Sequence, residues 1–307
     1  MENLWIAESS GAALCQALRY AALKELNKYL STLVSTYVRL LFSFPLHIPY
    51  VAAVFLWTSA ALPSLNARFL IFAAITAVGQ FLSTAMMIRL FQMGNFAVGT
   101  MLTKSDVVIT ALIGTVLFGE VISGLGWFAI TVTALGVLIV SAGRMPAGAW
   151  WQSDARLFEI VAGRATRWGL AVGVINALSY QFLRETMLAL EPGTLPVVRA
   201  AVAGFAMTLF SVVFLGAWLL ATEREGLKRI PQHQGAGWLL GFLSALGTIL
   251  WYLATVDANA SYVAAVAQVQ VVFSLLLSRY WFSETIKPLE LLGIAAILVG
   301  VLMFRLV

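Results

Sequence analysis

Residues 17–39 read ALRYAALKELNKYLSTLVSTYVR, and residues 177–199 read ALSYQFLRETMLALEPGTLPVVR. Aligned without gaps, the two stretches are identical at eight positions. Three of these identities are polar, and they pair Tyr20 with Tyr180, Glu25 with Glu185, and Arg39 with Arg199. A second pair of stretches, FGEVISGLGWFAITVTALGVL from residue 118 and FSETIKPLELLGIAAILVGVL from residue 282, is identical at eight of 21 positions. Matched Tyr, Glu and Arg residues are hard to explain by chance in a Leu-rich chain, so we infer an internal repeat.

The composition indicates the surroundings in which this repeat folds. Hydrophobic residues make up 61% of the 307 residues, charged residues make up 11%, and the mean hydropathy is +0.91. A typical soluble domain has about 25% charged residues, so we expect the chain to lie in a lipid bilayer. The single cysteine, Cys15, excludes an intrachain disulfide scaffold. Basic loops at the membrane surface explain the net charge of +5 better than nucleic-acid binding does.

Ten apolar segments are long enough to cross the membrane. A bilayer core of about 30 Å needs roughly 20 mostly apolar residues per helix, and these Leu-, Ala- and Gly-rich runs differ from the short alternating strands of a barrel. The predicted spans are residues 4–23, 31–57, 68–90, 95–118, 123–143, 168–189, 195–221, 236–256, 260–282 and 286–305. A polar linker at 144–167 separates a first five-helix repeat (1–143) from a second (168–307).

An odd number of spans per repeat brings the second repeat into the membrane from the opposite side. The sequence therefore predicts an all-α integral membrane protein with ten transmembrane helices in two inverted five-helix repeats. This architecture is common in transporters, whose substrate site lies near the bilayer midplane. Channels and some enzymes also contain internal repeats, so transport is the favoured interpretation among several.

Basic residues are distributed unequally between the two ends of the predicted spans. The end with the polar linker has twelve, which are Lys24, Lys28, Arg89, Arg144, Arg156, Arg164, Arg167, Arg224, Lys228, Arg229, Arg279 and Lys287. The end with both termini has three, which are Arg68, Arg184 and Arg305. By the positive-inside rule, we expect a cytoplasmic linker and external termini, in a bacterial inner membrane. The amino terminus has no Lys or Arg before residue 7, so we expect the first span to be retained.

Lys104 and Asp106 lie near the middle of the fourth predicted span. An ionised side chain there costs roughly 2.5–3.5 kcal/mol on insertion scales, so such residues usually face a cavity or a partner. Two residues apart on a helix, they point to nearly opposite sides. In the functional interpretation, Lys104 binds an anionic substrate group and Asp106 couples transport to an ion; in the alternative, both pair with neighbouring helices. Gln268 and Gln270 occupy the equivalent positions of the ninth span.

Other polar residues are candidates for the lining of a central cavity. Gln16 and Tyr20 are repeated as Asn176 and Tyr180, each pair one helical turn apart. The predicted substrate-binding residues are Lys104, Gln268, Gln270, Gln16, Arg19, Tyr20, Asn176, Tyr180, Gln80, Trp251 and Tyr252. Tryptophan and tyrosine also form belts at membrane interfaces, and that alternative stays open for Trp251 and Tyr252.

Two arginines are predicted at opposite mouths of the molecule. Arg39 and Arg199 lie early in the second and seventh spans, where they attract or gate a substrate. Alternatively, they snorkel to the interface or pair with Glu25 or Glu185. We expect these two glutamates to have structural roles.

Two further acids and two glycines are expected to stabilise the helices. Glu120 and Glu284, in the motifs FGE and FSE, directly precede a predicted span, where an acid favours the helix N-terminus. A structural role is therefore expected for both. Gly136 and Gly300 are expected to let helices pack closely.

Nothing in the sequence indicates an enzyme, a metal centre or a cofactor. It contains no P-loop, no HExxH, no G-x-S-x-G and no paired Cys/His ligand set. His47 and His233 have no triad or metal partner in the pattern, so we expect both to be structural. Without an ATP-binding segment, uphill transport requires an ion gradient, substrate exchange or a separate energising partner.

The two halves share a further pattern, in which F-G-E or F-S-E is followed by a Gly-containing helix such as ALGVLIVSAG or GIAAILVGVLMF. With the basic pairs Lys24/Arg39 and Arg184/Arg199, this pattern resembles the EamA-like branch of the drug/metabolite transporter superfamily over nearly the whole chain. The resemblance implies ten helices in two inverted repeats, metabolite transport across the inner membrane, often as export, and a cavity lined by helices 1, 3, 4, 6, 8 and 9. Many members of that branch have proline where Asp106 and Gln270 stand and have cytoplasmic termini, so this chain departs from the pattern.

The favoured hypothesis is a secondary transporter, an exporter or exchanger of a small polar or amphipathic metabolite such as an amino acid, working by alternating access around a central cavity. Its partners are then the substrate, the bilayer, and protons or another coupling ion. A lipid flippase or scramblase is one alternative, and a structural or signalling membrane protein is another. The sequence leaves open the substrate, the direction of transport, the coupling ion and the choice between monomer and homodimer.

Overall fold

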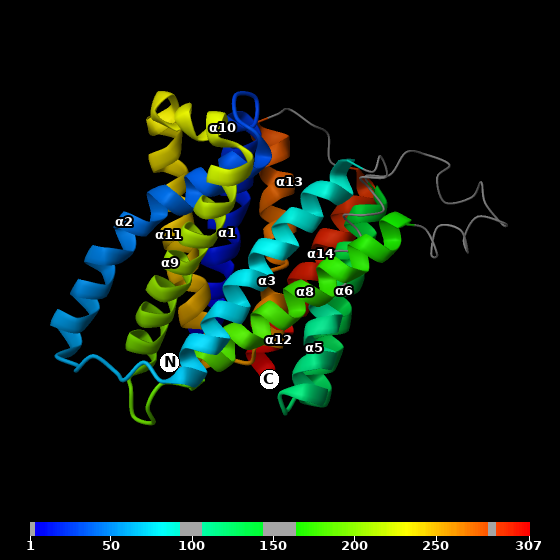
Figure 1. Ribbon diagram of the computed structural model, residues 1–307. Coiled ribbons are helices and arrows are strands. Elements are labelled where there is room, and N and C mark those ends of the chain that lie inside the picture. Colours follow the sequence, from blue (N-terminus) through cyan, green and yellow to red (C-terminus); the bar gives the residue numbers. More distant parts are fainter. Residues whose placement is uncertain (1–3, 93–105, 144–163, 282–286) are drawn as a thin grey trace. The chain divides into compact units, whose positions relative to one another are not determined.

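The computed structural model describes residues 4–92, 106–143, 164–281 and 287–307, and over these residues it is helical without any strand (Figure 1). The prediction of an all-α chain is confirmed. The helices are α1 (Leu4–Leu26), α2 (Thr32–Thr58), α3 (Ala67–Gln92), α5 (Asp106–Leu117), α6 (Gly124–Gly143), α8 (Arg164–Leu188), α9 (Pro196–Thr222), α10 (Arg224–Lys228), α11 (Gln234–Asp257), α12 (Ala260–Val266), α13 (Val269–Trp281) and α14 (Pro288–Met303), with 3-10 turns η1 (Ile230–His233) and η2 (Phe304–Leu306).

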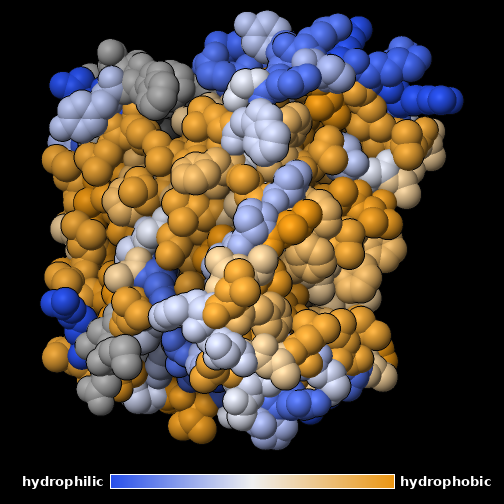
Figure 2. All heavy atoms as spheres, turned by 90° about the vertical axis from the view of Figure 1, so that its left-hand side faces the viewer, coloured by the Kyte–Doolittle hydropathy of each residue, from blue (hydrophilic) through white to orange (hydrophobic). Residues whose placement is uncertain are grey.

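Several helices have the length and apolar composition that a bilayer requires. Seven such candidates occur in the described ranges, and helical backbone is suited to lipid because it satisfies its own hydrogen bonds. Large apolar side chains such as Leu56 and Trp57 point outward, with 83% and 81% of their surface exposed. On the face that includes α2, Figure 2 shows a broad hydrophobic area with hydrophilic side chains above and below it. The chain is therefore an integral membrane protein.

The chain folds into two compact units. Unit 1 comprises Met1–Phe81 with Phe182–Asn259, and unit 2 comprises Leu82–Gln181 with Ala260–Val307. The unit boundaries fall inside α3 and α8 and therefore differ from the predicted boundaries of the two repeats. Arg164 and Arg167, which belong to the predicted linker, are helical and part of α8.

In unit 1, α1, α2, α9 and α11 lie side by side (Figure 1). α1 packs most extensively against α11, and the pair is antiparallel, because Gly11 meets Leu250 while Gly247 meets Cys15. The glycines let the helices approach closely, since a Cβ atom at Gly11 would lie 3.0 Å from the Leu250 side chain. This register places the first turns of α1 beside the last turns of α11.

α2 and α9, the second helices of the two predicted repeats, also run antiparallel. Gly216 meets the ring of Tyr37, and Gly204 lies near His47, so residue numbers fall along one helix as they rise along the other. Buried aliphatic side chains fill the space between the helices of unit 1 in two clusters, one around Val198 and one around Val34.

One end of unit 1 carries a concentration of charged loops. The α1–α2 loop meets the start of α10, where the Ser31 hydroxyl donates a short hydrogen bond to Glu223, and the Tyr29 ring stacks on His233 at 5.1 Å. The basic residues at this end are Lys24, Lys28, Arg224, Lys228 and Arg229. The structure thus brings together two loops that the charge distribution assigns to the same side.

In unit 2, α6 and α14 cross in close contact. A Cβ atom at Gly136 of α6 would lie 2.8 Å from the Ile297 nitrogen and 2.9 Å from the Gly293 oxygen of α14. Only a hydrogen atom fits between the backbones there, which is the close packing that small residues permit in membrane helices. The packing role predicted for Gly136 is confirmed.

Gly300 of α14 makes the reciprocal contact with the backbone of α6. A Cβ atom at this glycine would lie 3.0 Å from both the Ala129 oxygen and the Thr133 nitrogen of α6. In the alignment of the repeats, Gly300 is equivalent to Gly136, and Ala129 and Thr133 are equivalent to the two α14 residues that Gly136 meets. Gly136 and Gly300 therefore make equivalent contacts, each with the equivalent residues of the other helix. A two-fold axis between the antiparallel helices α6 and α14 requires this pattern.

Candidate functional site

A polar group of four predicted residues lies in unit 1, on α1 and α2. The Gln16 amide donates to the Tyr20 hydroxyl at 3.2 Å, and the Arg19 guanidinium lies 5.7 Å from the Tyr20 ring centroid. Arg39 of α2 is close enough to interact electrostatically with Arg19 and Tyr20. Two neighbouring guanidinium groups favour an anion beside them, so this group suits a carboxylate or a phosphate.

The charged pairs differ from those considered in the sequence. Glu25 pairs with Lys28 at 2.6 Å, and this hydrogen bond raises the pKa of the Lys28 ammonium group. Glu185 pairs with Arg68 of α3 at 2.8 Å. Neither glutamate therefore pairs with the arginine of the following span.

Arg199 forms hydrogen bonds with the backbone of the loop that leads into α9. Its Nε donates to the Thr194 oxygen and its Nη2 to the Glu191 oxygen, both at 3.0 Å. A guanidinium held by two backbone carbonyls organises the loop, which favours the structural alternative for Arg199 over the gating one. Its repeat counterpart, Arg39, lies beside Arg19 instead.

The remaining predicted residues of unit 1 differ in their burial. Tyr252 is buried in the cluster around Val198 and donates its hydroxyl to the Met207 sulfur at 3.3 Å. Trp251 packs at the edge of the same cluster, and Gln80 of α3 is exposed. This placement favours a packing role for Tyr252.

In unit 2, the ninth predicted span is broken in the middle. α12 ends at Val266 and α13 begins at Val269, and the amide nitrogens of Gln268 and Gln270 bond to carbonyls three residues back instead of four. The Gln268 side chain donates to the Ala264 oxygen at 3.3 Å, in place of the backbone nitrogen that a continuous helix would supply. Its Oε1 atom has no hydrogen-bond partner among the described residues, although only 7% of the residue is exposed.

Asp106 stands at the equivalent place of the first repeat. It lies in α5 and is buried, and Thr110 donates its hydroxyl to the backbone carbonyl oxygen of Asp106 at 2.6 Å. Asp106 and Gln270 are equivalent in the alignment of the repeats, and both lie in described helices of unit 2, α5 and α13. Lys104 lies outside the described residues, as does Glu284.

The other predicted residues of unit 2 lie on α8. Asn176 accepts a hydrogen bond of 2.6 Å from the Ser83 hydroxyl of α3, whereas the equivalent Gln16 bonds within its own helix. Tyr180 is half-buried one turn further along α8. The repeat in sequence is thus not matched by identical hydrogen bonds.

Glu120 is a buried acid at the centre of a hydrogen-bond network in unit 2. Its Oε1 accepts from the Ala260 backbone nitrogen at 2.8 Å, and its Oε2 accepts a short hydrogen bond from the Ser261 hydroxyl. Gln181 donates to the backbone carbonyl oxygen of Thr110 at 3.2 Å, and the Ser261 hydroxyl oxygen lies 3.3 Å from that same carbonyl oxygen. Glu120 therefore caps the N-terminus of α12, and not that of the following helix α6 as the sequence suggested.

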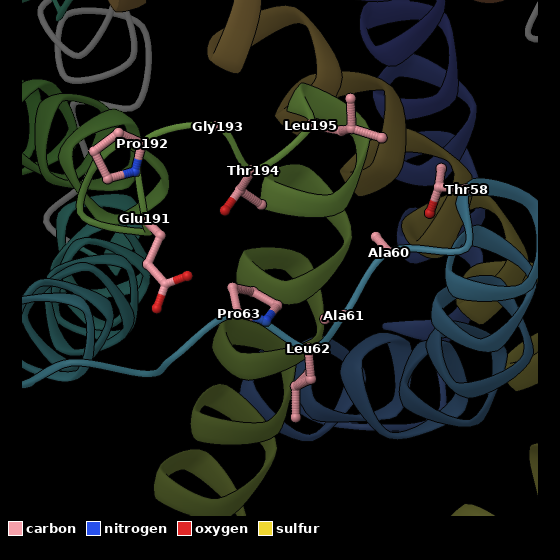
Figure 3. A pocket seen from close by; sticks show the side chains of 10 residues that line it. All are labelled: Thr58, Ala60, Ala61, Leu62, Pro63, Glu191, Pro192, Gly193, Thr194 and Leu195. Carbon is pink, nitrogen blue, oxygen red and sulfur yellow. The ribbon is translucent and has the colours of Figure 1, made fainter.

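A surface cleft of about 440 Å³ lies in unit 1 where α2 ends and α9 begins, at the end opposite to the charged loops around α10 (Figure 3). Two loops, residues 58–63 and 191–195, form its walls. Glu191 supplies its charged side chain, and Ser64 donates a short hydrogen bond to it. None of the predicted substrate residues lines this cleft, so it is distinct from the predicted site.

Known proteins share both the sequence pattern and the fold of this chain. The model of the EamA-like transporter family matches residues 3–142 and again residues 165–306. A solved structure, titled only "Crystal structure of protein", superimposes with a TM-score of 0.73 at 14% identity, over 99% of this chain and 96% of its own. At that identity the likeness concerns the fold alone. No curated protein matches the sequence.

Proposed function

Because this chain belongs to the EamA-like transporter family, we propose that it is a secondary transporter of a small polar or amphipathic metabolite such as an amino acid. It exports or exchanges this substrate by alternating access around a central cavity, in the inner membrane of a bacterium. The substrate is a small molecule, and a proton or another ion couples its movement. Members of this family are membrane transporters and, in general, not enzymes.

The contact pattern of repeat-equivalent helices is the observation that carries this proposal. α2 runs antiparallel to α9, and α6 runs antiparallel to α14 with contacts that exchange between the repeats. Antiparallel equivalents are the expected result of inverted five-helix repeats. That architecture supports alternation, because two inverted halves can exchange conformations and open the same site to either side of the membrane.

The broken ninth span supports a substrate site near Gln268 and Gln270. Discontinuous helices in inverted-repeat carriers present helix ends and unwound backbone to substrates and ions. We assign Gln268, Gln270 and Lys104 to substrate binding and Asp106 to ion coupling. Arg19 and Arg39, which lie beside each other in unit 1, favour a substrate with an anionic group. Transport is tested first by uptake and counterflow of radiolabelled acidic, basic and neutral amino acids in proteoliposomes. If none of these amino acids moves faster than in empty liposomes, the assignment of an amino-acid substrate is contradicted.

Replacing Lys104 with alanine is expected to reduce the initial rate of transport roughly tenfold to a hundredfold, since a hydrogen bond to a charged group is worth about 1.5–3 kcal/mol. The loss should appear with anionic substrates and be small with neutral analogues. Lys28→Ala is the matched control, because Lys28 lies in an exposed loop and pairs with Glu25. An unchanged transport rate for Lys104→Ala would show that Lys104 does not bind the substrate.

The charge distribution predicts that both termini lie outside the cytoplasm. Twelve basic residues lie at the linker end of the predicted spans and three at the end with both termini, which favours a cytoplasmic linker. A C-terminal alkaline phosphatase fusion should therefore be active, and a C-terminal green fluorescent protein fusion should be dark. Fusions placed in the linker after residue 150 should give the reverse pattern. A fluorescent C-terminal fusion would overturn this topology.

A further inference from the structure

An acid that the substrate assignment does not use is buried in the first helix. Glu8 of α1 has 9% of its surface exposed, and its Oε2 atom has no hydrogen-bond partner among the described residues. An unpaired ionised carboxylate is costly inside a membrane protein, and such residues usually have a functional partner. Glu8 therefore requires a ligand that neutralises it.

The helix register brings a second carboxylate to this place. α1 and α11 are antiparallel, with Gly11 beside Leu250, so the first turns of α1 lie beside the last turn of α11. Asp257, the last residue of α11, is close enough to Glu8 to interact with it electrostatically. Two neighbouring carboxylates repel each other when both are ionised and are stabilised when they share a proton.

Within the described part of the chain, no basic side chain pairs with Glu8 in place of a proton. α1 packs against α11 and α2, and the titratable groups of these helices that interact with Glu8 are Asp257 and Tyr50. The Tyr50 hydroxyl is buried and has no hydrogen-bond partner among the described residues. His47, one turn earlier on α2, lies near Gly204 of α9, and Arg39 interacts with Arg19 further along α1.

We propose that Glu8 is a proton-binding site of this transporter, additional to the ion-coupling role proposed for Asp106, and that Asp257 connects Glu8 to water. Asp257 is exposed whereas Glu8 is buried, which gives the proton a route from solvent. In the transfer, the O–H bond of the Asp257 carboxylic acid breaks and a new O–H bond forms on Glu8, so that Asp257 becomes the carboxylate and Glu8 the neutral acid. The coupling of this proton to substrate movement rests on the proposed transport function.

The site is tested by infrared difference spectroscopy of the purified protein during a pH titration. The wild-type protein should show the carbonyl band of a protonated carboxylic acid, and Glu8→Gln should lose one such titrating group. Glu25→Gln is the matched control, because Glu25 lies on the same helix but is 55% exposed and paired with Lys28, and it should leave the band unchanged. An unchanged band in Glu8→Gln, with melting temperature retained, would overturn the proposal.

Two further experiments test whether the bound ion is a proton or a metal cation, and whether Glu8 couples the proton gradient to substrate transport. Loss of the band when sodium chloride replaces choline chloride at constant pH would assign the site to sodium and overturn the proton assignment. In proteoliposomes, Glu8→Gln should lose the stimulation of uptake by an imposed pH gradient while keeping counterflow exchange; stimulation equal to wild type would overturn coupling through Glu8. If the wild-type protein shows no flux at all, the transport function fails, and the infrared titration still decides whether Glu8 binds the proton.

Discussion

Replacing Glu120 with alanine is expected to destabilise the protein by about 3 kcal/mol or more and to lower the yield of folded material. The carboxylate accepts from the Ala260 nitrogen and the Ser261 hydroxyl inside unit 2, and Glu120 is only 5% exposed. Each buried donor that loses its acceptor costs about 1–3 kcal/mol, and both lose it in this variant. The loss is read as a lower melting temperature in detergent and a smaller monodisperse peak in size-exclusion chromatography.

Two further variants show whether the loss of stability in Glu120→Ala comes from the lost hydrogen-bond network or only from the removal of an acid. Glu120→Gln keeps one carbonyl oxygen as an acceptor, so its melting temperature should lie between those of wild type and Glu120→Ala. Glu25→Ala removes an acid that is exposed in its pair with Lys28, and exposed ion pairs contribute little. A Glu120→Ala protein as stable as Glu25→Ala would show that the network does not stabilise α12.

The motif FGE predicts a structural role for Glu120, but it does not predict which helix Glu120 caps. The prediction placed the acid at the start of the next helix in the chain, because local order is all that a motif shows. In the structure its partners are about 140 residues away, at the start of α12. Sequence patterns reveal which side chain is unusual, whereas the partner depends on the packing of distant helices.

The bounds of the helices follow from local sequence, whereas a break inside a helix does not. The predicted span 195–221 differs by one residue at each end from α9, because Pro196 begins the helix and the charged residues after Thr222 end the apolar run. The break at Gln268 was not predicted, since the stretch AAVAQVQVV contains neither glycine nor proline. The Gln268 side chain compensates for the interruption by bonding to Ala264, and that contact has no signature in the sequence.

Glu8 illustrates a functional candidate that the sequence pattern conceals. As the fifth residue of the predicted span 4–23, this acid resembles an interfacial residue that reaches water, and the aligned repeat has no acid at the equivalent position. Its burial follows from the antiparallel contact of α1 with α11, which joins parts of the chain about 240 residues apart. A polar residue near a predicted helix end is therefore informative only when the neighbouring helix is known.

Gly136→Ala and Gly300→Ala are expected to destabilise the protein by similar amounts, about 1–3 kcal/mol each, as overpacked cores do. The new methyl group would lie 2.8 Å from the Ile297 nitrogen in the first variant and 3.0 Å from the Thr133 nitrogen in the second. Backbone atoms cannot move aside as a flexible side chain does, so α6 and α14 must separate. Differential scanning fluorimetry of the two variants in the same detergent measures the change.

Gly124→Ala is the matched control on the same helix, because a Cβ atom at Gly124 meets nothing within 4 Å. That variant should keep the wild-type melting temperature, since alanine is the better helix former where space permits. Equal losses for Gly136→Ala and Gly300→Ala follow only if the two glycines occupy equivalent places in one two-fold contact. A loss confined to one of them would contradict the exchange symmetry of α6 and α14, and with it the structural support for inverted repeats.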